Sequence, residues 1–437
     1  MKTAYPIIEA LWRLQRNLVS DEYDQALYRL RDALDGRMVI HEYPTGEPCW
    51  TWKVPEKWTC DAAYLETLDG RRVIDFAEQP LHVVSYSLPF EGVVDRQTLL
   101  SHLHVHPRLP DAVPFVFKYY QRDWGLCATR QQRDALDQPH YRVVIRTRFE
   151  PGTLKVGEVV IPGQSRQSLV LVAHLCHPAM VNDDLSGVAV GVDVARALLA
   201  GPQPYYTYRL LILPETIGSV AYLSHNEQLI PYMQAGLFLE MLGGDQPHAL
   251  QGSFLPGSQA DRLFGAALPT FDPHSWSAPY RQVINNDERQ FNAPGVRVPM
   301  LSISRVERRD SPTWPYPEYH SSHDTPAIVT PERLDASTRL VLGLIDAWER
   351  NQYVVNHFKG EIFCSGYGIW VDYTVNPEGH RRLFEIMERI DGTRRVADIA
   401  VELEIPFQAA FEVCDLLVSK GLASYSRSPV NTDPHLA

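Results

Sequence analysis

A buried apolar run that ends in metal-binding residue types dominates this sequence. Residues 169–173 are all apolar, which predicts a strand covered on both faces. The metal-binding types follow within eleven residues: His174, Cys176, His177, Asp183 and Asp184. An apolar helix is predicted next, over residues 188–200. Open α/β sheets bind ligands at the carboxyl ends of their strands, so a ligand site is expected here. The alternative is that Asp183 or Asp184 only caps the helix.

Strands and helices alternate through the surrounding chain. Strands are predicted at residues 157–161, 206–213, 236–239 and 299–304, and a long helix at 331–350. This alternation predicts an α/β fold, with a mostly parallel central sheet flanked by helices.

Three of these strands are followed by further residues with catalytic or metal-binding side chains. Glu215 follows strand 206–213, Glu240 follows strand 236–239, and His320 lies in the loop after strand 299–304. Because the carboxyl ends of parallel strands meet at one edge of a sheet, we expect these side chains to converge on the 174–184 segment.

The chain is predicted to contain three domains. Residues 1–46 and 139–352 form the α/β domain, and residues 47–138, rich in alternating aromatic and polar residues, form an inserted β-rich domain. Residues 353–437 contain three predicted helices, at 381–390, 396–403 and 407–420, whose spacing indicates a winged helix. Acidic residues outnumber basic ones in this last segment, which favours packing or homo-oligomer formation over DNA binding.

Charge and cysteine usage narrow the partners and the compartment. The net charge of −12 argues against nucleic acid or an anionic membrane as a partner. The six cysteines are scattered, which suits a reducing compartment. No window approaches the ~18 apolar residues of a membrane span, and the amino terminus has no signal-peptide core. A cytoplasmic protein is expected.

The residue types suit hydrolysis assisted by a divalent metal ion. Such a reaction needs nitrogen and oxygen ligands, an open position for water, and a nearby base. His177, Asp183 and Glu240 would supply one site, Asp183 could bridge to a second ion at His320, and Glu215 is placed to act as the base. Taken singly, Glu215 could instead be a surface carboxylate and Glu240 a charge at a helix start.

The order of these motifs resembles the co-catalytic zinc aminopeptidases of the bacterial leucyl aminopeptidase type. The motifs are His…Asp-Asp-x-Ser-Gly, Glu before Thr-Ile-Gly-Ser, Glu-Met-Leu-Gly, and Tyr-His-x-x-x-Asp-Thr. Cys176-His177-Pro178, residues 182–187, residues 214–219 and residues 119–127 more closely resemble a bacterial aminopeptidase-like subfamily. The resemblance implies an inserted β domain, a carboxy-terminal winged helix, and an association with polysaccharide or secondary-metabolite biosynthesis.

Carried over by position, the resemblance implies His177 and Glu240 as ligands of one zinc ion. Asp183 would bridge, His320 would bind a second ion, and Glu215 would be the general base. His174 is an alternative to His177, and Asp184, which stands where the wider family has Asn, is a further candidate ligand. Arg289 and Tyr319 are candidates for substrate binding, and Asp324 is expected to support a ligand rather than to bind the metal.

Thr216 departs from the family pattern, which has a second glutamate at this position. A neutral hydroxyl is a poor zinc ligand, so one zinc ion is expected and the second site should be weak or empty. The sequence therefore predicts a zinc-dependent hydrolase of amide bonds, an aminopeptidase acting on a small peptide or an aminoacylated metabolite. The alternatives are a deacylase of a sugar or natural-product intermediate and a metal-poor binding or scaffold protein.

Overall fold

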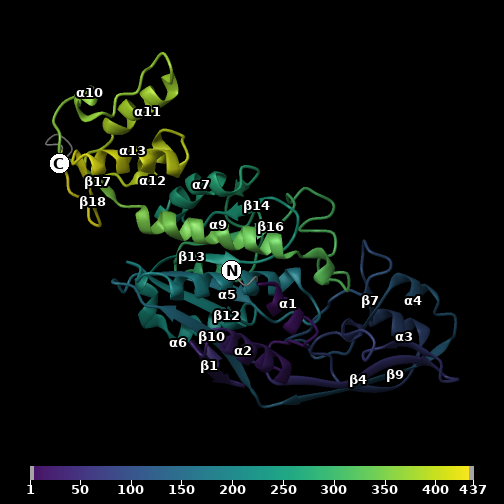
Figure 1. Cartoon of the computed structure of the whole chain (residues 1–437). Helices are drawn as coiled ribbons and strands as arrows, with labels where there is room; N and C mark the ends of the chain where they lie inside the picture. The colour runs from purple at the N-terminus through teal and green to yellow at the C-terminus, as the bar shows by residue number, and fades with distance from the viewer. Residues whose placement is uncertain (1–3, 433–437) are drawn as a thin grey trace.

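The computed structural model describes residues 4–432 and centres on an eight-stranded sheet (Figure 1). In spatial order its strands are β1 (Met38–Pro44), β10 (Thr153–Ile161), β12 (Thr207–Leu213), β11 (Ser168–His174), β13 (Met233–Leu239), β16 (Met300–Arg305), β14 (His248–Gln251) and β15 (Trp276–Ala278). The four central strands, β12, β11, β13 and β16, run parallel, whereas β10 and β14 join their central neighbours antiparallel. The predicted α/β class with a mostly parallel centre is confirmed.

Helices cover both faces of this sheet. They are α1 (Tyr5–Leu11), α2 (Asp21–Ala33), α5 (Gly187–Ala200), α6 (Ile217–His225), α7 (Gln259–Phe271), α8 (Glu288–Phe291) and α9 (Pro331–Arg350). Gly157 of β10 faces Leu27 of α2, whereas the next residue, Glu158, accepts a hydrogen bond from Tyr222 of α6. Successive strand residues point to opposite faces, so α2 and α6 lie on opposite sides. Within residues 4–432, no helix combines the length and apolar character needed to cross a bilayer.

The register of the central strands explains why the predicted site residues converge. All seven residues of β11 are buried, as expected for a strand covered on both faces. In the parallel ladders His174 pairs with Leu213 of β12, and Val172 pairs with Phe238 of β13. The chain therefore leaves the sheet at one edge on all three strands, with Glu215 and Glu240 immediately beyond.

The inserted segment forms a second sheet, of order β5-β4-β9-β6, at one end of the molecule (Figure 1). The elements of this part are β2 (Pro48–Cys49), β3 (Trp52–Lys53), β4 (Lys57–Thr67), β5 (Arg72–Asp75), β6 (Phe90–Asp95), α3 (Arg96–Ser101), β7 (Leu103–Val105), β8 (Leu126–Ala128), α4 (Arg130–Asp134) and β9 (His140–Glu150). The sequence assigned β9 to the α/β domain, but β9 pairs with β4 and β6. The second sheet thus continues past residue 138, because β9 alternates buried and exposed residues as a one-sided antiparallel strand does.

The carboxy-terminal segment lies at the opposite end of the molecule from the second sheet (Figure 1). It contains β17 (Tyr353–Asn356), α10 (Cys364–Tyr367), α11 (Pro377–Met387), α12 (Val396–Glu402), α13 (Phe407–Ser419) and β18 (Ala423–Ser426), and β17 pairs antiparallel with β18. The three predicted helices are present as α11, α12 and α13, with ends shifted by a few residues. The winged-helix assignment itself stays a prediction.

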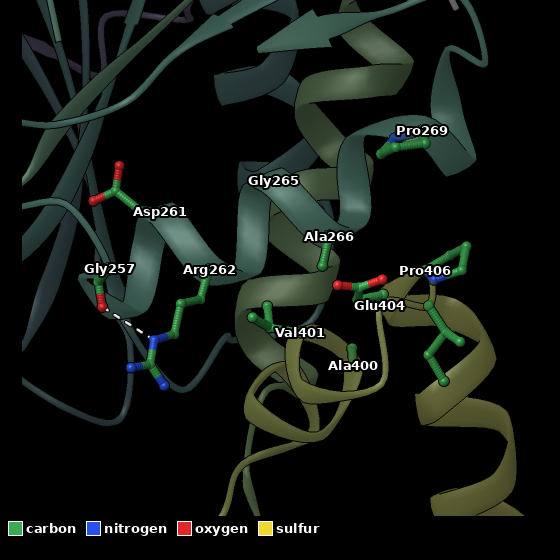
Figure 2. Close-up of a pocket in the computed structure, with 11 residues that line it drawn as sticks. Gly257, Asp261, Arg262, Gly265, Ala266, Pro269, Ala400, Val401, Glu404 and Pro406 are labelled. Atoms are coloured by element: carbon green, nitrogen blue, oxygen red, sulfur yellow. Dashed lines mark hydrogen bonds between the residues drawn. The ribbon is translucent and has the colours of Figure 1, made fainter. Parts of the chain in front are cut away.

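The carboxy-terminal helices dock against α7. Figure 2 shows the groove at this junction, where apolar atoms of Ala266, Val401 and Pro406 face one another. Arg262 on α7 donates to the carbonyl of Gly257 at 3.1 Å and forms an ion pair with Asp398 at 2.9 Å. This junction involves none of the predicted site residues.

Candidate active site

The carboxyl ends of β11 and β13 bring three candidate ligands into direct contact. Nε2 of His174 lies 3.1 Å from Oε1 of Glu240 and 3.2 Å from Oδ1 of Asp183, and all three residues are buried. The sequence prediction favoured His177 as the partner of Glu240. The structure places His174 there instead, because His174 ends β11 and Glu240 directly follows the adjacent parallel strand β13.

His177 lies three residues after His174, in the loop that follows β11, and contacts a different set of residues. Its Nδ1 is 3.4 Å from Oδ2 of Asp184 and 3.9 Å from Oδ1 of Asp183, and its Nε2 is 3.7 Å from Oε2 of Glu215. This Nε2 is buried and has no hydrogen-bond partner among residues 4–432. His177 therefore has one ring nitrogen without a hydrogen bond, on the side of the ring that faces Glu215.

Asp183 contacts a histidine through each of its two carboxylate oxygens. Its Oδ1 lies 3.2 Å from Nε2 of His174, and its Oδ2 lies 3.1 Å from Nε2 of His320. The Asp183 backbone leaves the helical region, with φ −106° and ψ 95°. Asp324 accepts the backbone N–H of Asp183 at 3.1 Å and that of Asn182 at 2.7 Å, so Asp324 holds this loop. Burial raises the pKa of Asp324 to about 7.

Asp184 faces the protein interior. It forms a fully buried ion pair with Arg16 at 3.0 Å and accepts the backbone N–H of His177 at 2.8 Å. Arg16 also donates to the carbonyls of Leu11, Leu175, His177 and Met180. The amino-terminal segment thereby fixes the loop that carries the histidines. Sequence reasoning missed Arg16, because all of its partners except Leu11 lie 159–168 residues further along the chain.

Glu215 lies in a strained turn between β12 and α6. Its backbone N–H donates to the sulfur of Cys176 at 3.1 Å, and the next residue, Thr216, has φ +63°. A non-glycine residue with positive φ has to be held by its surroundings. Asp287 does this by accepting the N–H of Thr216 at 2.8 Å and the hydroxyl of Ser219 at 2.6 Å. Burial raises the pKa of Asp287 to about 6.

Two further residues beside the site escaped sequence reasoning. Asn286 donates from Nδ2 to Oε1 of Glu240 at 2.5 Å, and its backbone N–H donates to Glu288 at 2.9 Å. Burial raises the pKa of Glu288 to about 8. These contacts orient Glu240. The only sequence signal was their place just before Arg289, which was predicted to bind substrate.

The charges of the cluster fit bound cations. Burial alone would lower the pKa of His174, yet the neighbouring Asp183 and Glu240 carboxylates raise it well above its usual value. Burial raises the pKa of Glu240 to about 7. Oδ1 of Asp183 and Oε2 of Glu240 are buried and accept no hydrogen bond from the described residues. Unpartnered buried carboxylate oxygens are costly, and a metal ion would satisfy them.

Three sets of donor atoms in the cluster are compact enough to hold a metal ion. The donors of each set lie within 4.8 Å of one another. The sets are His174, Asp183 and Glu240; His177, Asp183 and His320; and His174, Cys176, His177 and Glu215. Imidazole and carboxylate are ordinary zinc ligands, so these residues fit the ion that the sequence predicted.

A cavity of about 340 Å³ opens beside Glu215. Arg289 and Thr216 line it, and Nη2 of Arg289 donates to the Thr216 hydroxyl at 2.9 Å. The inserted segment supplies the aromatic wall, which includes Trp52, Phe117 and Tyr119. Tyr319 does not line this cavity; its ring stacks on His320, with centroids 3.9 Å apart.

Comparisons with known proteins agree with this fold. A Clostridium acetobutylicum protein, described as a candidate polysaccharide biosynthesis protein with an aminopeptidase-like domain, is 30% identical over 420 residues, 94% of each chain. The crystal structure of a candidate peptidase from Clostridium acetobutylicum matches with a TM-score of 0.85 at 28% identity, covering 97% of this chain and 96% of that chain.

More distant structures show the fold alone. The zinc aminopeptidase BSAP from Bacillus subtilis matches with a TM-score of 0.58 at 14% identity, covering 79% of this chain and 93% of that chain.

The family model that matches residues 5–351 is described as a domain of unknown function, DUF4910. The resemblance inferred from the motifs is confirmed: the chain has the fold of the zinc aminopeptidases and belongs to the DUF4910 family.

Proposed function

We propose that this protein is a metal-dependent hydrolase of amide bonds that acts on a small peptide or an aminoacylated metabolite with a free amine. The observation that carries the proposal is Glu215, which lies at the cavity wall 3.7 Å from His177, beside the metal-ligand sets. The aminopeptidase-like domain in the description of the Clostridium relative supports the same reaction class.

His174, Asp183 and Glu240 would hold the metal ion. Their donor atoms are close together, and two of their carboxylate oxygens lack hydrogen bonds from the described residues. A divalent ion in such a site lowers the pKa of water and polarises the carbonyl group under attack. The Asn286 side chain and the β11–β13 register keep Glu240 and His174 in place for this role.

Glu215 is the general base of the proposed reaction. Its half-buried carboxylate takes the proton of the attacking water and then delivers it to the nitrogen of the leaving amine. The Thr216 turn, held by Asp287, keeps this carboxylate at the cavity wall.

Arg289 would bind an anionic group of the substrate. Its guanidinium lines the cavity and is tethered to the Thr216 hydroxyl, and a planar guanidinium suits a carboxylate. Glu215 lines the same cavity, so a short peptide with its carboxylate at Arg289 would lie beside the proposed base.

The test is a comparison of wild type with Glu215→Gln on aminoacyl amides and short peptides. We expect turnover to fall by about 10²–10⁴-fold, because the amide cannot accept the proton, while bound metal stays unchanged by plasma mass spectrometry. Glu227→Gln, an exposed glutamate after α6, is the matched control and should retain activity. Equal turnover of wild type and Glu215→Gln would contradict the proposed role of Glu215.

A deacylase of N-acylated amino sugars is the second candidate. The observation favouring it is the polysaccharide biosynthesis description of the Clostridium relative. N-acetylated sugars in the same substrate panel distinguish the two functions. Turnover of these sugars without turnover of aminoacyl amides would select the deacylase.

A further inference from the structure

We infer that the cavity beside Glu215 binds an aromatic amino acid with a free α-carboxylate, as the leaving half of a dipeptide or of an N-acylated amino acid. The inference rests on the proposed function, because the role of Glu215 as the base is what assigns this cavity to the leaving half. It goes further by naming the substrate class. Arg289 would bind the carboxylate, and aromatic residues of the inserted segment would bind the ring.

Arg289 has a guanidinium that no carboxylate of the protein compensates. Its Nη2 donates to the Thr216 hydroxyl at 2.9 Å, its Nε is buried without a hydrogen-bond partner, and within residues 4–432 it forms no ion pair. Lys118 also lines the cavity, but it pairs with Asp123 and donates to a backbone carbonyl at 3.2 Å. A buried donor without a partner is costly, and a bound carboxylate would satisfy the Arg289 Nε–H.

The position of Arg289 fits a carboxylate on the leaving amino acid. The Thr216 side chain that holds Arg289 belongs to the residue directly after Glu215. In a leaving amino acid, the α-carboxylate is attached to the carbon next to the nitrogen that takes the proton from Glu215. Proton delivery and carboxylate binding are therefore needed at neighbouring points, and Glu215 and Arg289 line the same cavity.

The inserted segment lines the cavity with aromatic rings that the protein itself leaves uncovered. Trp52, Phe117 and Tyr120 are 39%, 44% and 48% exposed. Phe117 stacks on Tyr119 with ring centroids 4.5 Å apart, and Trp52 meets Tyr120 edge-on with centroids 6.0 Å apart. Large apolar side chains that gather uncovered at a cavity are typical of a ligand site.

Contacts within the protein hold these rings in position. The hydroxyl of Tyr120 donates to the carbonyl of Lys53 at 3.0 Å, which ties Tyr120 to the hairpin that carries Trp52. Tyr119 packs edge-on against Tyr86, with centroids 5.4 Å apart. Such preorganised rings lose little freedom when a ligand binds. Pairs of aromatic rings also gain free energy beyond that of buried area, so an aromatic side chain is favoured over an aliphatic one.

The charge and size of the cavity argue against other ligands. An uncharged N-acetylated sugar could stack on the rings, but it would leave the guanidinium of Arg289 without an anion. The cavity measures about 340 Å³, near the lower end of the range of about 300–1,000 Å³ for small-molecule sites. This volume suits a single amino acid rather than a polypeptide.

The inferred reaction is hydrolysis of the amide bond at the nitrogen of the aromatic residue. The oxygen of water bonds to the carbonyl carbon, the C–N bond breaks, and the nitrogen takes a proton of that water through Glu215. The products are a carboxylic acid and the free aromatic amino acid. Water is the only co-reactant.

Steady-state kinetics of the zinc-loaded full chain on matched dipeptides tests the inference. Ala-Phe should exceed Ala-Gly in kcat/KM by about 10–100-fold, because it buries a phenyl side chain. It should exceed Ala-Leu by about 2–10-fold through ring-to-ring contact. It should exceed Ala-Phe amide by about 10–100-fold, because the amide lacks the charged partner of Arg289.

Two variants assign these ratios to residues. Arg289→Met should remove the difference between Ala-Phe and its amide, and Phe117→Ala should lower the ratio of Ala-Phe to Ala-Gly by about threefold or more. The matched controls are Arg281→Met and Phe254→Ala, since both residues are exposed and neither lines this cavity. Both controls should keep both ratios. Each ratio compares two substrates on one protein sample, so partial unfolding of a variant does not alter it.

Calorimetry with L-phenylalanine as the probe gives a readout that needs no turnover. Wild type should bind it saturably, Arg289→Met should not, and L-phenylalaninamide should bind about tenfold more weakly or worse. Binding without turnover of any dipeptide would support the subsite and contradict the proposed function. Glu215-dependent turnover in which Ala-Gly, Ala-Leu or the amide equals Ala-Phe would overturn this inference alone. Neither binding nor turnover would overturn both.

Discussion

The structure gives Asp184 a structural role that the sequence did not predict. It follows Asp183 directly and was a candidate ligand, yet its carboxylate forms an ion pair with Arg16, and both side chains are fully buried. Removing one partner of a buried ion pair leaves the other charge without compensation, which is strongly destabilising. Arg16 therefore stabilises the fold and positions the histidine loop at the same time.

Arg16→Met tests this role. The substitution keeps the length of the side chain but leaves Asp184 uncompensated, so the free energy of unfolding should fall by about 3–5 kcal/mol. Urea denaturation measures the change. The control is Arg13→Met, because Arg13 is exposed and should alter stability by no more than about 0.5 kcal/mol. An equal decrease in the free energy of unfolding of the two variants would show that the buried ion pair does not contribute more to stability than an exposed arginine does.

At the scale of elements, Glu158 joins four parts of the α/β core. From β10 it reaches His41 of β1 at 2.9 Å, Arg209 of β12 at 2.5 Å and Tyr222 of α6 at 2.7 Å. Burial by itself would raise the pKa of Glu158, but these three partners outweigh it and lower the pKa to about 2. The ionised carboxylate is thus stabilised in the folded state.

The sign of this shift fixes a pH dependence of stability. The folded-state pKa lies below the ordinary value of 4.5, so the stabilisation is present above pH 4.5 and is lost as the pH falls towards 2. Glu158→Gln should lower the free energy of unfolding at pH 7 by on the order of 2 kcal/mol and flatten its decline in acid. Glu42→Gln on β1 is exposed and serves as the control, measured by urea unfolding from pH 2 to 7. A decline in acid that is the same in both variants would contradict the prediction.

At the scale of the whole molecule, the inserted segment completes the candidate active site. Val113 and Ser322 exchange hydrogen bonds, and the N–H of Phe115 donates to the carbonyl of His320, so this segment is docked on the loop that carries His320. Its β2–β3 hairpin places Trp52 at the cavity beside Glu215. Substrate contacts are therefore expected from a part of the chain that holds no metal ligand.

Trp52→Ala tests this contribution of the insert. The loss of this aromatic contact should reduce kcat/KM by about fivefold to tenfold, mainly through KM, with metal content unchanged. Trp50→Ala is the matched control, because Trp50 lies in the same hairpin, is similarly exposed and does not line this cavity. Steady-state kinetics on the best substrate of the panel measures both variants. An equal loss in the two, or a loss of metal in Trp52→Ala, would contradict this role.

The sequence by itself determined the elements whose signal is local. The apolar run at 169–173 predicted the buried central strand, and helix 331–350 was placed at the residues that α9 occupies, because hydrophobic periodicity and the proline at its start are local signals. The convergence of Glu215, Glu240 and His320 on the 174–184 segment also followed, since parallel strands end at one edge.

Only the tertiary structure decided which residues meet within that edge. Whether His174 or His177 contacts Glu240 depends on the β11–β13 register, and a difference of three residues in a loop leaves no signature in residue type. The Arg16–Asp184 pair, the Asp287 contact beneath Thr216 and the aromatic wall join segments far apart in the chain. Such contacts are selected by the packing of the whole fold, and no local pattern in the sequence specifies them.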